Sequence, residues 1–205
     1  MYIEVSDRED LYIKIRSMTF TFNKTKIEWC IHISPTIHGD KRWFFLESYH
    51  ADKFAEWWIT TTFIQDNHSK SKAWVLRWCH FQTQHTQAKL VRVTHGSVLD
   101  IVLDARVWSP SFGQHIIIPL DAHNHHQLFV PKWCAHGFLT LEDDTEFLYK
   151  CDDIYAPEHD AGIYYDSFGI DRDGIKKKYW LTQFVMSPKD HELSTRNEYI
   201  KNPVF

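Results

Sequence analysis

The sequence predicts an all-β protein, built as a sandwich or barrel of short strands. Between Lys89 and Lys150, short runs rich in Val, Ile, Leu and Phe recur about every ten residues and are separated by turn residues. In the run "SVLDIVLDAR", the two-residue period of a strand separates a wholly aliphatic set of residues from a set that combines valines with two acids. Runs of this length and spacing are typical of β-strands that pack face to face.

The predicted elements follow in chain order. The segment "DKFAEWWI", Asp52 to Ile59, has helix-like spacing and predicts a short helix before the strands. The strand-like runs are "KLVRVTHGSVLDIVLDARV", "QHIIIPL", "QLFVPKW", "HGFLTL" and "TEFLYKC". The C-terminal third is irregular and predicts a strand-poor tail.

One predicted strand has two different faces. Leu99, Ile101 and Leu103 form a wholly aliphatic face, whereas the other face combines valines with Asp100 and Asp104. A strand with a partly polar second face commonly lines water or a ligand cavity, and small β-barrels hold ligands inside. The two acids are therefore candidates for such a cavity, although either alone is more typical of an ordinary solvent-facing position.

Length and composition limit the possible classes. A chain of 205 residues, 43% hydrophobic and 24% charged, predicts one globular domain over 1–205, with 1–17 as an N-terminal extension. The net charge of −4 provides no general field for nucleic acid, so we expect no nucleic-acid partner.

Cysteine spacing and hydropathy indicate the compartment. The four cysteines form no CxxC pair, which argues against a zinc knuckle or a redox motif. The N-terminus is charged, and nowhere do 18 uncharged apolar residues follow one another. We expect a cytoplasmic protein without a membrane partner.

The stretch "WVLRWCHFQ" places Arg77 and His80 in an apolar run, where burial without a partner is unfavourable. With Tyr149, Lys89 and His136, they supply a base, an acid and cations. Such groups can remove a proton next to a carbonyl and stabilise the enolate. Each residue alone also fits an ordinary structural role.

Eight ordered motifs carry a resemblance. They are "HGDKRWFFLESY", "FIQDNHSKS", "VLRWCHFQ", "AQAKLVRVTHGSVLDIVLDAR", "SPSFGQH", "QLFVPKWCAHGFLTLEDDTEFLYKC", "YAPEHDAGI" and "MSPKD". Over about Met18 to Phe205, the chain resembles the dTDP-4-dehydrorhamnose 3,5-epimerase family. The resemblance implies a cupin-type jelly roll (double-stranded β-helix) with a few short helices. It also implies a homodimer that works without metal or organic cofactor.

The resemblance also implies an activity and catalytic residues. The activity is 3,5-epimerisation of dTDP-4-dehydro-6-deoxy-D-glucose to dTDP-4-dehydro-L-rhamnose, in L-rhamnose biosynthesis. His80 matches the proton-abstracting base, and Asp190 matches the acid that orients and charges it. Lys89 matches the residue that stabilises the enolate, and Tyr149 matches the acid on the opposite face of the sugar.

Substrate-binding positions are implied in the same way. Arg77 and His136 match residues that line the sugar and phosphate site, and Asp100 falls on a further site position. Four further residues match nucleotide-contacting positions of the family: Arg42, Glu47, Gln65 and Asn67. In the family, some of these positions reach the ligand of a neighbouring subunit.

Tryptophan stands repeatedly where the family has glycine, at Trp43, Trp78 and Trp133. Trp29 and Trp58 look like further cases, and Trp74 lies next to another. The chain has 7 glycines, against about 14 expected at average usage. Either these side chains reshape or close the pocket, or the sequence as read is in error there.

Two alternatives to a working epimerase remain. One is a nucleotide-sugar-binding inactive paralogue whose tryptophans block the chemistry. The other is a metal-dependent cupin that uses "HNHH", His123 to His126, although a solvated loop explains that segment better. The paired histidines and glutamate usual in metal cupins are not found around His80, so we expect no metal.

Overall fold

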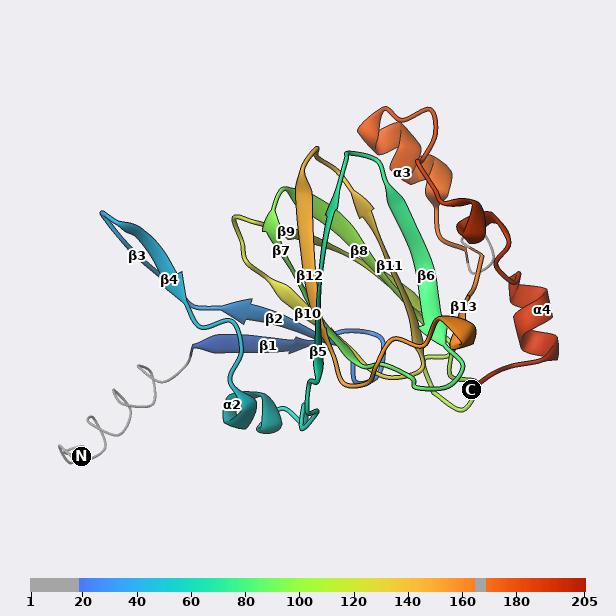
Figure 1. Ribbon diagram of the computed structural model, residues 1–205, viewed down its shortest axis with the longest axis horizontal. Coiled ribbons are helices and arrows are strands. Elements are labelled where there is room, and N and C mark those ends of the chain that lie inside the picture. The colour runs from blue at the N-terminus through green and yellow to red at the C-terminus, as the bar shows by residue number, and fades with distance from the viewer. Residues whose placement is uncertain (1–18, 165–168) are drawn as a thin grey trace, which may run out of the picture.

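The computed structural model describes residues 19–164 and 169–205. Two antiparallel sheets face each other (Figure 1). From edge to edge, the six-stranded sheet contains β1 (Phe20–Lys24), β2 (Ile31–Pro35), β10 (Gln127–Val130), β7 (Lys89–His95), β12 (Thr145–Cys151) and β5 (Gln65–Ser71). The five-stranded sheet contains β13 (Asp160–Gly162), β6 (Leu76–Gln82), β11 (Cys134–Thr140), β8 (Ser97–Asp104) and β9 (His115–Asp121). The all-β jelly roll is confirmed.

The remaining elements lie around the two sheets. A hairpin of β3 (Ile37–Asp40) and β4 (Trp43–Leu46) projects from the body. Within the described residues, the helices are α2 (Ala51–Ala55), α3 (Arg172–Tyr179) and α4 (Arg196–Lys201), with 3-10 turns η1 (Pro157–His159) and η2 (Pro188–His191). They agree with the few short helices expected. The proposed extension over 1–17 lies outside the described residues.

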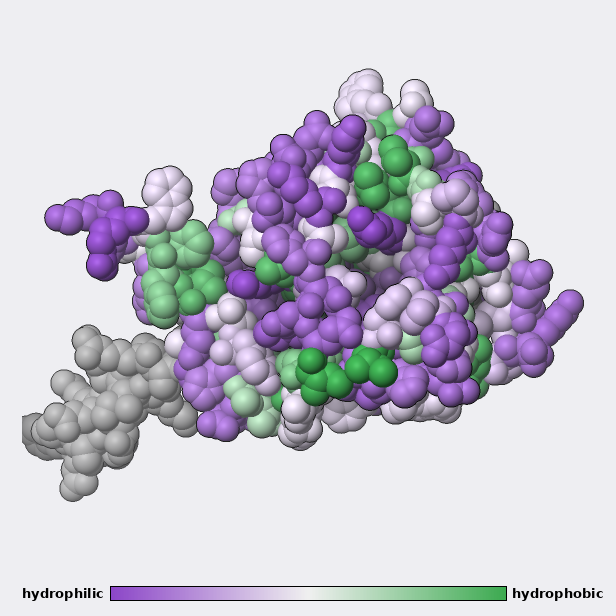
Figure 2. Space-filling model, in the orientation of Figure 1, coloured by the Kyte–Doolittle hydropathy of each residue, from purple (hydrophilic) through white to green (hydrophobic). Residues whose placement is uncertain are grey.

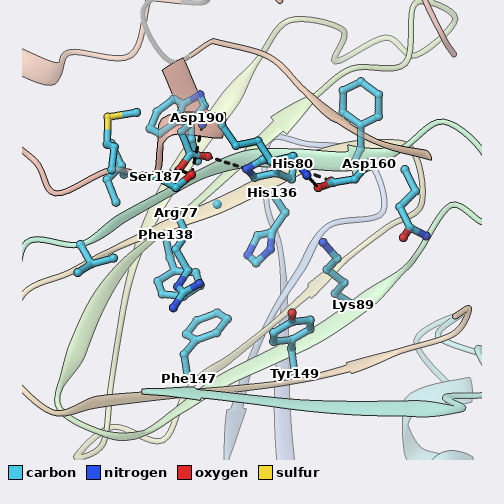
Figure 3. Close-up of a pocket in the computed structure, with 18 of the residues that line it drawn as sticks. Arg77, His80, Lys89, His136, Phe138, Phe147, Tyr149, Asp160, Ser187 and Asp190 are labelled. Atoms are coloured by element: carbon cyan, nitrogen blue, oxygen red, sulfur yellow. Dashed lines mark hydrogen bonds and ion pairs between the residues drawn. The ribbon is translucent and has the colours of Figure 1, made fainter. Parts of the chain in front are cut away.

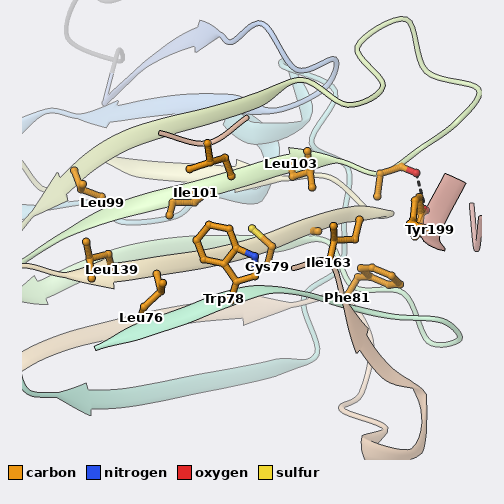
Figure 4. Close-up of a cluster of buried hydrophobic side chains, with 13 residues drawn as sticks. Leu76, Trp78, Cys79, Phe81, Leu99, Ile101, Leu103, Leu139, Ile163 and Tyr199 are labelled. Carbon is orange, nitrogen blue, oxygen red and sulfur yellow. Dashed lines mark hydrogen bonds between the residues drawn. The ribbon is translucent and has the colours of Figure 1, made fainter. Parts of the chain in front are cut away.

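The two faces of β8 divide as the alternation predicts. Leu99, Ile101 and Leu103 pack into a cluster on the outer face of the five-stranded sheet (Figure 4). Val98 and Val102 point the other way, into the core between the two sheets. The strand-poor tail covers the outer cluster, to which it contributes buried residues such as Ile170 and Tyr199. Burial on both faces therefore fixes the position of β8.

Helix α2 ends earlier than its spacing predicts. Phe54 is fully buried and anchors the helix to the six-stranded sheet. After Ala55 the chain turns back, because the Trp58 N–H donates to the Ala55 carbonyl and the Ile59 N–H donates to the Phe54 carbonyl. The apolar spacing predicted the helix, and the local turn sets its end.

Two further expectations concern loops and membranes. The segment His123 to His126 forms the turn between β9 and β10, as predicted, and the His126 ring packs edge-on against His32. Within the described residues, no helix combines the length and the apolar character needed to cross a membrane.

Candidate active site

A cavity of about 580 Å³ lies between the two sheets. Strands β6 and β11 supply one wall, β7 and β12 supply the other, and the segments around β13 and η2 contribute to the rim. Six predicted site residues line this cavity: Arg77, His80, Lys89, His136, Tyr149 and Asp190. The fold therefore brings together residues that are far apart in the sequence (Figure 3).

A β-bulge in β6 places both Arg77 and His80 in the cavity. His80 pairs with His136 and Arg77 pairs with Phe138, so three steps along β6 oppose two along β11. Strict alternation would have sent Arg77 and His80 to opposite faces. The extra residue lets Trp78 and Cys79 both join the outer cluster, and the two polar side chains share the inner face.

Gly137 makes room for the bulge on the neighbouring strand. A Cβ atom there would lie 2.5 Å from the Arg77 carbonyl oxygen and 2.7 Å from the carbonyl carbon of Trp78. Real side chains do not tolerate such distances to backbone atoms. Gly137 therefore permits the close approach of β11 to the bulged part of β6.

His80 is held by Asp190 from the C-terminal tail. Its Nε2 lies 2.7 Å from Asp190 Oδ1. The other carboxylate oxygen of Asp190 accepts hydrogen bonds from the hydroxyl and backbone N–H of Ser187, at 2.8 and 3.2 Å. This capping box starts η2 and fixes the buried carboxylate against the imidazole. This hydrogen bond therefore joins two residues that are 110 positions apart in the sequence.

A second carboxylate lies on the other side of the ring. Asp160 Oδ1 is 3.4 Å from His80 Nδ1, and Asp160 also pairs with Lys189. Burial by itself lowers the pKa of His80, but the two carboxylates outweigh burial and raise the pKa to about 9. Burial raises the pKa of both carboxyl groups, but His80 and Lys189 outweigh it at Asp160, and His80 and Ser187 outweigh it at Asp190, so both pKa values are lowered.

Tyr149 and Lys89 project from the opposite wall. Tyr149 lies on β12 and Lys89 on the neighbouring β7, and the Lys89 Nζ is 5.9 Å from the centre of the Tyr149 ring. Figure 3 shows the Tyr149 hydroxyl pointing into the cavity toward the His80 side. Burial raises the pKa of the Tyr149 phenol and lowers the pKa of the Lys89 ammonium. A protonated phenol therefore faces a histidine across the cavity.

His136 and Asp100 form a buried pair beside these groups. The His136 Nε2 lies 3.0 and 3.1 Å from the two Asp100 oxygens. Asp100 is fully buried behind His136, while His136 itself reaches the cavity and stacks on Phe147. Asp100 can therefore orient His136 without contacting a ligand directly.

Asp104, the other acid on this strand face, has a structural role. It accepts hydrogen bonds from Arg106 at 2.7 and 2.8 Å and from the Ser109 and Ser111 hydroxyls. Both members of the Asp104–Arg106 pair are fully buried. Asp104 therefore neither lines the cavity nor faces solvent, because these partners hold it buried at the end of β8.

The predicted nucleotide-contacting residues lie away from His80. Arg42 is exposed on the β3–β4 hairpin and pairs with Asp40. Glu47 follows the hairpin and is bound by Lys53 at 2.7 Å. Within this one chain, Arg42 and Glu47 do not join the cavity.

Gln65 and Asn67 are closer to it. They are hydrogen-bonded to each other on the inward side of β5, at 3.0 Å. Gln65 also accepts a hydrogen bond from the backbone N–H of Tyr155, a residue of the cavity rim. Asn67 lines a neighbouring hollow of about 200 Å³ that shares Tyr149 with the main cavity.

The cavity residues that were missed from the sequence include Tyr155, Asp160 and Lys189. All three lie within the recognised motifs "YAPEHDAGI" and "MSPKD". The motifs therefore contained these residues. The three side chains could be assigned to the site only from the structure, in which β13 pairs with β6 beside His80.

None of the three suspected tryptophans fills the cavity. Trp43 is 80% exposed on the hairpin, and Trp133 is 40% exposed and packs edge-on against Trp108. The Trp78 side chain is buried in the outer cluster (Figure 4). The cavity therefore stays open, so of the alternatives that the sequence raised, closure of the pocket by these side chains is excluded.

Potential metal ligands do not gather in the described part of the chain. No group of three His, Cys, Asp or Glu side chains within 19–164 and 169–205 is arranged to hold a metal ion. The histidines of the cavity are paired with carboxylates instead.

The family model described as dTDP-4-dehydrorhamnose 3,5-epimerase matches residues 24–198. The chain belongs to this family. It is 42% identical over 180 residues to the dTDP-4-dehydrorhamnose 3,5-epimerase of Escherichia coli K12, covering 87% of this chain and 95% of the relative. The family resemblance of the eight motifs is thereby confirmed.

Solved structures of the family have the same fold. An epimerase of Legionella pneumophila in complex with dTDP-4-keto-L-rhamnose superposes with a TM-score of 0.80 at 40% identity, covering 87% of this chain and 93% of that one. The Bacillus anthracis enzyme, with TDP and pyrophosphate bound, gives 0.79 at 35% identity, covering 86% and 99%.

Proposed function

We propose that this member of the epimerase family inverts carbons 3 and 5 of a dTDP-linked 4-keto-6-deoxyhexose, working as a single domain. The family assignment makes the chain an isomerase of the dTDP-sugar class. The observation that best supports the detailed reaction is the placement of His80 and Tyr149 on opposite walls of one cavity.

The opposed walls suit an inversion. Carbons 3 and 5 flank the ketone at carbon 4, so loss of a proton from either gives an enolate. His80 removes the proton from one face of the sugar, the Lys89 ammonium stabilises the enolate oxygen, and Tyr149 returns a proton to the other face. Asp190 orients His80 and stabilises its protonated form. Proton number is conserved, because Tyr149 and His80 re-equilibrate with solvent afterwards.

His80 must be neutral to accept a proton. With Asp160 beside Nδ1 and Asp190 on Nε2, its pKa of about 9 keeps the imidazole charged at pH 7. We propose that substrate binding draws Asp160 away from the ring toward Lys189, which already pairs with it. Loss of one carboxylate lowers the pKa and leaves a nitrogen free to act as the base.

Binding is assigned to the surrounding polar groups. Arg77, which reaches the cavity next to Ser71, can bind a phosphate through two parallel hydrogen bonds from its guanidinium. His136, oriented by Asp100, borders the sugar position. We assign the nucleotide to the hollow beside Tyr149 that Asn67 lines, with Gln65 hydrogen-bonded to Asn67.

Isotope exchange tests the reaction. The folded protein, incubated with dTDP-4-keto-6-deoxyglucose in deuterated water, should incorporate deuterium at carbons 3 and 5, which NMR detects. Binding of dTDP without exchange would instead favour a nucleotide-sugar-binding protein. Exchange at one carbon alone would restrict the activity to a single inversion.

We also propose a homodimer. Phe45 is 71% exposed and Phe44 is 46% exposed on the projecting hairpin, where Figure 2 shows a group of hydrophobic side chains. A second subunit would cover these rings, and Arg42 and Glu47 of one subunit would then lie at the cavity of the other subunit. Light scattering at micromolar concentration should give twice the chain mass, and Phe45→Glu should give a monomer. A monomeric parent protein would contradict the dimer.

A further inference from the structure

Six of the nine tryptophans have a positive φ, a conformation in which bulky L side chains are outliers. All nine lie within the described residues. The six are Trp29 (66°), Trp43 (129°), Trp58 (61°), Trp74 (66°), Trp133 (64°) and Trp180 (58°). Only three other non-glycine residues of the described chain have a positive φ, so the conformation is concentrated in one residue type.

Two of the six occupy the position after a helix that glycine normally fills. After α3, the Trp180 N–H donates to the Lys177 carbonyl, and the Leu181 N–H donates to the Lys176 carbonyl. After α2, the same two bonds run from Trp58 to Ala55 and from Ile59 to Phe54. This pair of bonds is the Schellman motif, whose left-handed residue is usually glycine because it has no Cβ.

The other four lie at tight connections between strands. Trp29 lies in the turn between β1 and β2, Trp74 between β5 and β6, and Trp133 between β10 and β11. Trp43 opens β4, and its φ of 129° lies outside even the left-handed helical region. All six are therefore positions where the backbone itself calls for glycine.

Burial does not compensate for this strain. Strained residues persist where the surrounding structure over-determines them, but five of the six side chains are between 40% and 94% exposed. Trp57 provides the contrast, because it has no positive φ and its ring stacks on Phe22 at 5.3 Å. Tryptophan at the six positions thus strains the backbone and gains little packing.

The glycine content points the same way. The chain has 7 glycines, about half of the roughly 14 that average usage predicts. Glycine at the six tryptophan positions with a positive φ would give 13.

We infer that the codon at these six positions is read as glycine in the cells that make this protein, so that the native enzyme carries glycine at all six. UGA is a suitable candidate for this codon. It is a stop in the standard code and is read as tryptophan in some variant codes, so a gene that uses UGA for glycine would give tryptophan at these positions when it is translated by one of those codes. The native hairpin and turns would then lack the exposed indoles. This inference is independent of the proposed reaction.

The gene and the native protein test the inference without any need to refold a variant. Sequencing of the gene should find UGA at all six positions and UGG at Trp57. Peptide mass mapping of the protein purified from its own cells should find glycine at all six. Tryptophan in the peptides, or UGG at these codons, would overturn the inference.

A stability comparison gives a second test. Two recombinant forms would be expressed, one with the six tryptophans and one with six glycines. The glycine form should melt at least about 5 °C higher, because backbone strain at six turns is removed. Trp57→Gly is the control and should lower the melting temperature, because it removes a stacked ring from ordinary backbone. A glycine form that melts no higher than the tryptophan form would count against the inference.

Discussion

The two faces of the five-stranded sheet are built from the same strands and have opposite chemistry. The outer face carries an apolar cluster that includes Leu76, Trp78 and Ile101 and is covered by the C-terminal tail. The inner face presents Arg77 and His80 from the same β6 strand to an open cavity. The outer face stabilises the fold, and the inner face holds the charged groups that take part in the reaction.

The difference shows how charge is accommodated next to a core. His80 and His136 each face a carboxylate at 2.7–3.1 Å, so each inner-face imidazole has a charged partner. The outer face needs no such partners, because burial of apolar surface alone stabilises it. We therefore expect substitutions on the inner face to affect the reaction, and those on the outer face to affect stability.

The largest effect is expected from His80→Asn. Loss of a general base should lower the deuterium exchange rate by about 10²–10⁴-fold, while the melting temperature and dTDP binding stay nearly unchanged. His123→Asn, in the turn before β10, is the matched control and should leave both quantities unchanged. If His80 were only a core residue, its loss would instead cost about 1–3 kcal/mol of stability, and activity would fall only in step with folding.

Ile101→Ala should show the opposite behaviour. Ile101 is 1% exposed in the outer cluster, so the free energy of unfolding should fall by about 2–5 kcal/mol. The exchange rate per folded molecule should not change. Urea unfolding measures the first quantity, and Ile200→Ala, at an exposed position of α4, should change it by less than about 0.5 kcal/mol. A large loss of activity in folded Ile101→Ala protein would erase the distinction between the two faces.

Gly137→Ala tests the bulge that creates the inner face. The added methyl group would lie 2.5 Å from the Arg77 carbonyl oxygen, so we expect a loss of about 1–3 kcal/mol from overpacking. The exchange rate should also fall, because β6 must shift and carry His80 with it. Gly39→Ala, where the nearest atom is 3.7 Å away, is the control. Equal stability of the two variants would mean that the close approach is unimportant.

A smaller effect concerns the pH dependence of the reaction. Because His80 acts as a base only when neutral, and its pKa in the free protein is about 9, kcat/KM should rise with pH and level off above about pH 9. Asp160→Asn removes one of the two carboxylates that raise this pKa, so the rise should move to lower pH. Asp173→Asn, on the exposed side of α3, should leave the profile in place. An unmoved profile in Asp160→Asn would remove Asp160 from the control of His80.

Much of this arrangement could be predicted from the sequence. Short apolar runs separated by turn residues predicted the strands, and the period of β8 assigned Leu99 and Ile101 to one face and Asp100 to the other. Motif order brought His80, Lys89, Tyr149 and Asp190 to one site. The bulge could not be predicted, because alternation alone sends Arg77 and His80 to opposite faces.

Other features depended on long-range contacts. Asp104 and Asp100 occupy the same strand face, yet Arg106 binds Asp104 at the strand end and His136 binds Asp100 beside the cavity. Asp160 could be placed beside His80 only once β13 paired with β6. Periodicity contains no information about such partners.

Tyr149→Phe tests most directly the claim that the two walls act on opposite faces of the sugar. His80 would still remove and return a proton on its own face, so carbons 3 and 5 should still exchange with deuterium while inversion is lost. NMR of the sugar recovered from deuterated water separates exchange from inversion. Deuterium incorporation with the original configuration retained is the predicted result. Continued inversion in folded Tyr149→Phe protein, or loss of exchange as complete as in His80→Asn, would contradict the account.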